Sequence, residues 1–195
     1  MKDKPNKPAR PPRADAVRNR ARVLAAAKTV FGAGGPQASL EAVAREAGVG
    51  IGTLYRHFPT REALFEAVYR REVEQLVELA AELTAWPAPV EALRHWLHAN
   101  VAFVATKKGM VAALALAAQG SSDLKASTSV KLTAAVRSLV DRAVAAGELR
   151  ADVWPGDVLH MLIALCYGSD APGWQQNVLR LLDVFVDGMR RSDAK

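Results

Sequence analysis

Residues 39 to 65 read SLEAVAREAGVGIGTLYRHFPTREALF, and their spacing predicts two short helices joined by a tight turn. Apolar side chains recur at i, i+3, i+4 and i+7 from Leu40 to Ala47, which places one apolar stripe along a short helix. Gly48 stands where this helix must end and the chain must take a left-handed conformation. The chain can then reverse and begin a second helix near Gly50, so the stretch has the outline of a helix-turn-helix.

The second of these helices has one apolar side and one polar side. Leu54 and Phe58 lie about one turn apart and are expected to face the protein interior, whereas Thr53, Arg56 and His57 fall on another side. Arg can bond bidentately to guanine and the methyl group of Thr can contact thymine, so the polar side suits the major groove of DNA. One face is expected to pack and the other to meet a partner.

The same stretch resembles the N-terminal domain of the TetR/AcrR family of bacterial repressors. That family has an Ala-Gly-Val turn, then Gly-Thr-Leu-Tyr, a His-Phe pair and a basic residue. Two positions depart from the pattern: Gly50 stands where the family often has a Ser cap, and Arg61 where it usually has Lys. The resemblance extends from Asp15 to about Val68. The matching residues are Ala47, Gly48, Val49, Gly52, Thr53, Leu54, Tyr55, His57, Phe58 and Arg61.

The resemblance implies DNA contacts for these residues. Tyr55 and Arg61 would hold phosphates, and the remaining residues of the second helix would approach bases or backbone in the major groove. Ser39 and the first amides of its helix suit another phosphate, because helix N-termini favour anions. Two alternatives are open: Tyr55 can pack beneath its helix, and His57 can be a buried histidine. The predicted DNA-binding residues are Ser39, Gly50, Gly52, Thr53, Tyr55, Arg56, His57 and Arg61.

Positive charge is concentrated in the N-terminal third. The 195 residues carry a net charge of +6, yet residues 1–62 hold 12 Lys and Arg against 5 Asp and Glu, and residues 63–195 hold 14 against 15. A basic end on a neutral remainder is typical of a DNA-binding domain, because phosphate neutralisation supplies most of the sequence-independent affinity. A charge bias that only favours solubility is the alternative.

Residues 1–14 are predicted to form a disordered basic arm, because proline and basic side chains predominate and apolar residues are scarce. Such an arm can enter a minor groove or remain a solvated tail. No apolar stretch suited to a signal peptide follows these charges. The longest uninterrupted apolar run, Met110 to Ala118, is too short to span a bilayer. With Cys166 as its single cysteine, the protein is expected to be cytoplasmic and to have no membrane partner.

Helix signals run along the whole chain, and no segment alternates strictly as a strand would. Residues 15–70 are predicted to form a three-helix DNA-binding domain. A long fourth helix, capped by Thr60 and ending near Leu83, is expected to join it to a second domain, residues 71–195. The first helix is predicted over 15–31, with a buried side made of Val17, Ala21, Leu24, Ala27 and Phe31.

The second domain is predicted to be a helical bundle for ligand binding and dimerisation. It is similar to the SbtR-type ligand domains found in part of the TetR family, on scattered apolar positions and the turn from Gly147 to Asp152. The expected fold is all-α with about nine helices in total. Glycine and proline divide this half into helices at about 89–106, 109–119, 122–146, 156–168 and 174–190.

The last two of these helices are apolar on most sides. A helix that is apolar all round has to be buried all round, which peripheral helices of one small bundle do not achieve. We therefore expect a two-fold homodimer with a four-helix seam; the alternative is that both helices form the core of a monomer. The predicted interface residues are Leu162, Leu165, Val178, Leu182, Phe185 and Met189.

No convincing catalytic constellation is present, and an enzyme is not expected. His160 and Cys166 are six residues apart on one predicted helix and therefore point in different directions. His95 and His98 have the i, i+3 spacing of half a zinc site, but a third ligand would have to come from elsewhere. We predict no metal and no cofactor.

Large apolar side chains in the second half suit a small-molecule cavity between helices, with ordinary core packing as the alternative for any one of them. The expected effector is a small hydrophobic or amphipathic molecule. The resemblance implies that it moves the fourth helix and changes the separation of the two recognition helices. The predicted pocket residues are Trp96, Phe103, Met110, Met161 and Tyr167, with His98, Gln119 and His160 as polar anchors.

These features predict a dimeric, ligand-responsive transcriptional regulator. In the family that the chain resembles, such a protein is most often a repressor, binds a palindromic double-stranded operator and is released by a small molecule. Two alternatives are open: a DNA-binding architectural protein without an inducer, and a metal-dependent sensor that uses His95 and His98.

Overall fold

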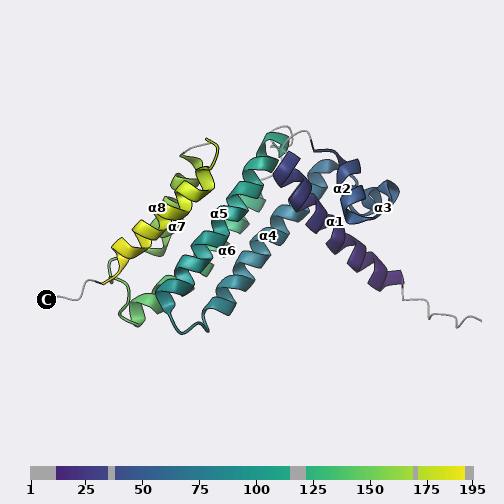
Figure 1. Ribbon diagram of the computed structural model, residues 1–195. Coiled ribbons are helices and arrows are strands. Elements are labelled where there is room, and N and C mark those ends of the chain that lie inside the picture. Colours follow the sequence, from purple (N-terminus) through teal and green to yellow (C-terminus); the bar gives the residue numbers. More distant parts are fainter. Residues whose placement is uncertain (1–11, 35–37, 115–121, 169–170, 192–195) are drawn as a thin grey trace, which may run out of the picture.

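The computed structural model describes residues 12–34, 38–114, 122–168 and 171–191, and the regular elements within these ranges are all helices (Figure 1). The predicted all-α class is confirmed, with eight helices in the described ranges where about nine were expected. They are α1 (Pro12–Gly34), α2 (Leu40–Ala47), α3 (Ile51–His57), α4 (Arg61–Leu83), α5 (Pro89–Leu114), α6 (Ser122–Ala145), α7 (Pro155–Tyr167) and α8 (Trp174–Met189).

Two boundaries correct the sequence-based expectations. α5 runs through Gly109, where a break was predicted, because one glycine inside a helix costs only about 1 kcal/mol and packing along a long helix exceeds that. α1 begins at Pro12, so residues 12–14 are helical and do not belong to a disordered arm. A proline is tolerated in a first helical turn, where its missing N–H would have no partner. Residues 1–11 and 115–121 lie outside the described ranges.

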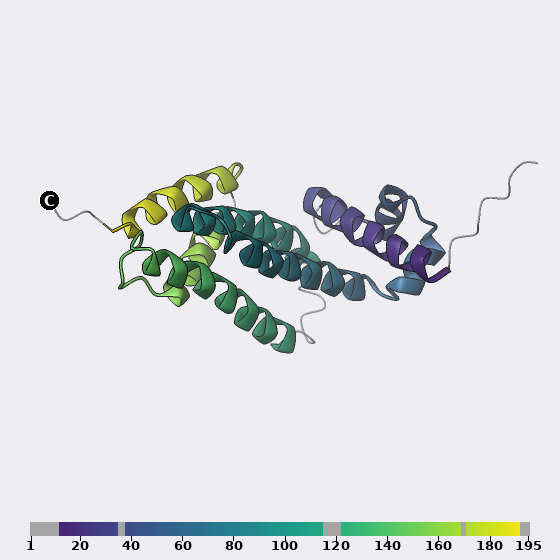
Figure 2. The same ribbon diagram turned by 90° about the horizontal axis from the view of Figure 1, so that it is seen from below.

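The helices form an elongated arrangement. Figures 1 and 2 show α1, α2 and α3 at one end, α7 and α8 at the other, and α4, α5 and α6 between them. Two hydrophobic cores correspond to the two ends: one contains buried residues between Val23 and Val68, and the other contains buried residues between Val73 and Met189. No helix of the described residues is long and apolar enough to cross a membrane.

α4 contributes to both cores. Phe65 and Val68 in its first half belong to the N-terminal core, and Val73 and Leu83 in its second half belong to the C-terminal core. α1 also packs against α4 and α5, and Lys28 of α1 forms an ion pair of 2.6 Å with the buried Glu72 of α4. A movement of α4 would therefore change the packing of the N-terminal core and the contacts of α4 with α1.

The predicted buried stripe of α1 is wrong in its N-terminal half. Leu24, Ala27 and Phe31 are buried as expected, but Val17 is 66 % exposed and Ala21 is exposed. The first turns of α1 extend away from α2 and α3 (Figure 1), so apolar periodicity continues there without a neighbouring helix to cover it.

Four of the six predicted interface residues are buried within one chain. Leu162, Val178, Leu182 and Met189 lie in the C-terminal core, and Leu165 and Phe185 pack partly against it. The four have no surface to offer a second copy, because α7 and α8 each turn one face to their own bundle. Other large side chains of α7 and α8 are exposed, namely Ile163, Tyr167, Leu181 and Val184.

Candidate nucleic-acid interface

α2, the helix that leads into the turn before α3, is capped at both of its ends. The Oγ of Ser39 accepts a hydrogen bond of 3.1 Å from the amide of Ala42 and so caps α2. Gly48 has φ 61° and ψ 40°, the left-handed conformation expected of it. Its amide bonds to the carbonyl of Arg45, and the amide of Val49 bonds to the carbonyl of Ala44, each at 3.0 Å. These bonds end α2 within one turn and redirect the chain.

α3 follows with one buried face and one exposed face. Leu54 and Phe58 are buried in the N-terminal core, as the spacing predicted. Gly52, Tyr55 and Arg56 are exposed. Because the Tyr55 side chain is 44 % exposed, the alternative in which it packs beneath the helix is wrong.

The other polar positions of α3 are less open. Thr53 and His57 are half-buried, and the His57 ring lies 6.3 Å from the Phe58 ring between centroids. The sequence analysis left open whether His57 contacts DNA or is buried. Its side chain is neither fully buried nor fully exposed. Gly50 precedes α3 in an extended conformation with φ −68°, so it caps the helix without a side-chain bond.

Arg61 lies at the first position of α4, half-buried against two aromatic rings. Its guanidinium carbon is 5.5 Å from the centroid of Phe31 and 5.2 Å from that of Phe65. Such stacking holds the planar cation in one place. Thr60 caps the same helix end, its Oγ1 accepting from the amide of Ala63 at 3.1 Å. A phosphate contact of Arg61 remains a prediction, and in this structure the side chain also ties α4 to α1.

Two arginines of α1 lie beside the helix-turn-helix, and sequence reasoning did not assign them a role. The guanidinium carbon of Arg20 lies 5.4 Å from the ring centroid of Phe58, and Nη2 of Arg22 donates to the carbonyl of Gly48 at 3.3 Å. Both side chains are exposed. Their spacing of two residues gives no helical signal, so only the packing of α1 on α2 and α3 could place them here.

The predicted pocket residues separate in the structure. Trp96 is fully buried in the C-terminal core, where its Nε1 donates to the carbonyl of Leu76 at 2.8 Å. His98 lies 2.8 Å from Asp183 between Nε2 and Oδ1, His160 is exposed, and Met161 is half-buried. The Met110 side chain and Gln119 lie outside the described residues. Of the predicted residues that the structure describes, Phe103 and Tyr167 alone line the cavity described next.

A cavity of about 170 Å³ lies between α4, α5, α6 and α7. α4 contributes Tyr69 and α5 contributes Asn100 and Lys107, none of which was predicted. Their signal in the sequence is weak, because polar residues at helical spacing usually belong to a solvated face. Asn100 is buried, and its Nδ2 donates to the carbonyl of Trp96 at 2.9 Å, which fixes the amide inside the fold.

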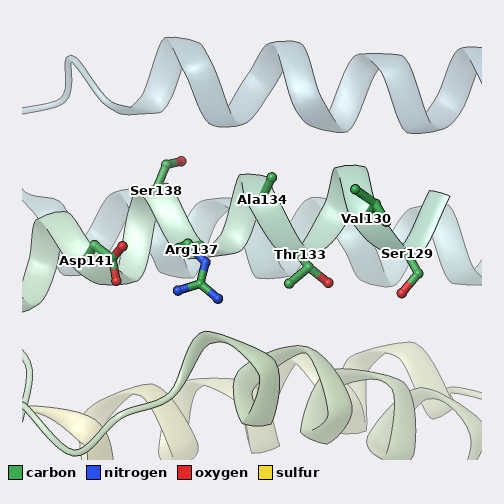
Figure 3. Close-up of a pocket in the computed structure, with 7 residues that line it drawn as sticks. All are labelled: Ser129, Val130, Thr133, Ala134, Arg137, Ser138 and Asp141. Carbon is green, nitrogen blue, oxygen red and sulfur yellow. The ribbon is translucent and has the colours of Figure 1, made fainter. Parts of the chain in front are cut away.

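A more open hollow runs along one face of α6 (Figure 3). Its labelled side chains all come from this one helix, and Val130 among them is largely exposed. The described residues that line this hollow come from a single helix face, so the cavity with walls from four helices is the better ligand site.

The histidines proposed as half of a metal site have other neighbours. The His95 ring lies 5.1 Å from the Trp86 ring, and His98 pairs with Asp183. Among the residues that the structure describes, no three His, Cys, Asp or Glu side chains come together as metal ligands would.

Comparisons with known proteins agree with both halves of this description. Residues 23–68 match the family described as bacterial regulatory proteins, tetR family. Residues 88–191 match the C-terminal domain described as transcriptional regulator SbtR-like. An HTH-type transcriptional regulator of Staphylococcus aureus (strain MRSA252) is 41 % identical over 49 residues, which are 23 % of this chain and only 26 % of that protein.

Solved structures extend the match to nearly the whole chain. A TetR transcriptional regulator of Streptomyces coelicolor is 42 % identical with a TM-score of 0.81, covering 89 % of this chain and 99 % of that one. A TetR transcription regulatory protein of Mycobacterium vanbaalenii is 35 % identical with a TM-score of 0.76, covering 93 % of this chain and 100 % of that one. The chain therefore belongs to the TetR family of DNA-binding transcriptional regulators, with an SbtR-like C-terminal domain.

Proposed function

We propose that this regulator is a homodimeric repressor that binds a palindromic operator and is released when a small molecule enters the cavity between α4 and α7. The observation that carries the DNA-binding part is the exposed face of α3, with Tyr55 and Arg56 open to solvent, beside the arginines of α1. The proposal divides the chain into a DNA-binding unit over 15–70 and a ligand-binding and dimerisation unit over 71–195.

The proposed DNA contacts centre on the exposed residues of α3 and extend to half-buried residues beside them. Arg56 reads a base edge in the major groove, and Gly52 lets the start of α3 approach the bases closely. Tyr55 and Arg61 hold phosphates. Ser39, Gly50, Thr53 and His57 complete the surface, and Arg20 adds positive charge from α1, which strengthens binding to any duplex.

The proposed dimer uses the outer faces of α7 and α8. Trp154 and Val184, both largely exposed, line one groove together with Phe185. Large exposed apolar side chains gathered on two neighbouring helices mark an interaction surface. A two-fold pair on this surface presents two α3 helices to half-sites about one duplex turn apart, or a multiple of that distance.

The proposed release works through α4. Tyr69 lines the cavity from α4, and Glu72, three residues along that helix, pairs with Lys28 of α1. A ligand that displaces Tyr69 therefore acts on the helix that both cores share. The expected coupling is about 1–3 kcal/mol, or about 5- to 150-fold in DNA affinity.

Selection of bound duplexes from a random pool tests the DNA-binding proposal. We expect enrichment of a palindrome, and then repression of in vitro transcription from a promoter that carries the selected site. Enrichment of a single, asymmetric half-site would contradict two-fold binding, and activation of the promoter would contradict the repressor assignment.

A further inference from the structure

The cavity between α4, α5, α6 and α7 has a mainly apolar lining, to which Asn100, Lys107, Thr128 and Ser129 add polar groups. Its walls include Phe103, Val104, Leu132, Leu159 and Leu162, all buried. Among the described residues that line it, Lys107 is the only charged one, and none is acidic. Among the described lining residues, a ligand in this cavity therefore meets one positive charge and no negative one.

Lys107 lies at the opposite end of the cavity from Asn100. The two residues are seven positions apart on α5 and therefore share one face, separated by about 10 Å along the helix axis. Phe103 and Val104 lie between them on the same helix. The cavity thus has an ammonium group at one end, an amide at the other and hydrocarbon between.

Aromatic rings hold the Lys107 ammonium without neutralising its charge. Its Nζ lies 5.9 Å from the ring centroid of Tyr69 and 5.8 Å from that of Tyr167. In the described part of the chain Lys107 forms no ion pair. Nζ of Lys108 lies 5.3 Å from the same Tyr167 ring.

The lysine and tyrosine side chains that line the cavity favour a ligand with a negative charge. Aromatic faces can attract a cationic ligand, but here lysines already occupy the faces of Tyr69 and Tyr167 and would repel one. A phosphate is best held by several donors, such as an arginine fork, whereas the described lining offers one lysine. A single ammonium matches a single carboxylate.

The volume selects the size of the ligand. A cavity of about 150 Å³ accommodates benzene, and this one measures about 170 Å³. We propose that it binds a small organic carboxylate with an apolar body of about six to eight carbon atoms, the carboxylate paired with Lys107. The inference specifies the ligand class of the site in the proposed function and rests on that function.

Matched acids and amides test the inference with the purified full chain. The probes are benzoate against benzamide and heptanoate against heptanamide, titrated by calorimetry. Each pair has the same apolar body, so the difference reports the charge. We expect each acid to bind at least about tenfold more tightly than its amide, as for a hydrogen bond between charged groups.

Three variants locate the charge. Lys107→Met keeps the length of the side chain and should abolish the preference for the acids, while binding of the amides stays within about twofold. Lys107→Arg should retain the preference. Lys131→Met is the matched control, because it removes an equal charge from an exposed position on α6 and should leave the preference unchanged.

Equal binding of acid and amide, no binding by either acid, or an undiminished preference in Lys107→Met would each overturn the inference. Fluorescence anisotropy on the selected operator separates it from the proposed function. Acids that bind through Lys107 without changing operator affinity support the ligand class and contradict the release mechanism. Operator binding that persists while no acid binds contradicts the ligand class alone.

Discussion

Gly48 is the residue on which the angle between α2 and α3 depends. Its φ of 61° suits a residue without a Cβ, and a Cβ built there would lie 2.5 Å from Nη2 of Arg22. We predict that Gly48→Ala lowers the free energy of unfolding by about 1–2 kcal/mol, the cost of a left-handed conformation in a residue with a side chain. The arginine end is flexible and can move aside. Urea unfolding followed by circular dichroism measures the difference.

Gly52 provides the matched control and a separate prediction. Nothing lies within 4 Å of a Cβ built on Gly52, and its backbone is helical. Gly52→Ala should leave the free energy of unfolding unchanged or raise it by up to about 1 kcal/mol. If α3 lies close against the bases, the added methyl should nevertheless weaken operator binding by about tenfold. Unchanged affinity by anisotropy would place Gly52 away from the groove.

Arg56 and Tyr55 are expected to affect DNA binding differently. Arg56→Ala should relax the sequence preference at one or two base pairs, each worth about 1–3 kcal/mol, because a bidentate contact to a base is lost. Tyr55→Ala should weaken binding to all duplexes alike, because a phosphate contact carries no sequence information. Duplex selection with each variant distinguishes the two, and identical selection profiles for Arg56→Ala and the wild type would contradict base reading.

Local spacing was enough to predict which face of α3 is exposed. Leu54 and Phe58 are buried and Arg56 is exposed as expected, because a short helix between two caps has little freedom to rotate. Arg20 and Lys107 were not found, because their roles depend on helices distant in the sequence. Arg61 was assigned to phosphate from the resemblance, and its stacking on Phe31 and Phe65 required the fold.

At the scale of elements, a cluster of charges joins α5 to α8. Arg94 of α5 bonds through Nη1 to Oδ1 of Asp183 at 2.9 Å, and it also pairs with Asp187 and with Glu91. Burial alone would raise the pKa of Asp183, but the hydrogen bonds from Arg94 and His98 outweigh it and hold that pKa below its ordinary value. The hydrogen bond from Arg94 likewise lowers the pKa of Asp187.

We predict that Arg94→Met lowers the free energy of unfolding by about 1–2 kcal/mol at pH 7. This is the usual contribution of hydrogen bonds between charged groups, reduced because the carboxylates that Arg94 contacts are exposed to solvent. A carboxylate whose pKa is lower in the folded than in the unfolded protein stabilises the fold. This stabilisation is fully present at pH values above the ordinary pKa of Asp, about 4. That stability is lost as the pH falls through the folded-state value. The difference from wild type should therefore shrink as the pH falls below about 4.

Arg180→Met is the control for this prediction. Arg180 is an exposed arginine of α8, the helix that carries Asp183 and Asp187, and it bonds to Oδ1 of Asn177 at 3.2 Å and to no carboxylate among the described residues. Its loss should change the free energy of unfolding by less than about 0.5 kcal/mol, both at pH 7 and below about pH 4. A pH-independent loss of stability in Arg94→Met would show that its packing against α8 matters more than its charge.

Helix existence was more predictable than helix extent. Caps such as Ser39 and Thr60 act over one turn and mark where α2 and α4 begin. α5 continues through Gly109 because its packing against several neighbouring helices stabilises the helix. The same non-local effect leaves Val17 exposed despite its place in an apolar pattern, since nothing in the described fold covers that end of α1.

At the scale of the whole molecule, the sequence indicated more apolar surface on α7 and α8 than one chain can bury, but not which residues remain outside. Apolar composition alone does not separate Leu182, fully buried, from Val184, two positions away and 67 % exposed. The bundle assigns one face to its own core. The dimer is therefore best tested at Val184, because a substitution there does not disturb the fold of the single chain.

We predict that Val184→Glu converts the proposed dimer to a monomer of 20.9 kDa while the helix content is retained. A carboxylate in the seam would be desolvated without a partner, whereas on a free chain it is solvated. Leu182→Asp should instead unfold the protein, because the charge would lie in the core. Val17→Glu makes the same change as Val184→Glu at a valine of α1 that is equally exposed, and it should leave the dimer intact.

Sedimentation equilibrium together with circular dichroism separates these outcomes. A monomeric Val184→Glu variant should also lose most of its affinity for the palindrome while a single half-site is bound as weakly as before, because two linked α3 helices bind far more tightly than one. A Val184→Glu protein that remains dimeric at micromolar concentration would move the seam away from the outer face of α8. If Leu182→Asp stayed folded and only its dimer dissociated, the buried position of Leu182 would be wrong and the seam would lie on the opposite face of that helix.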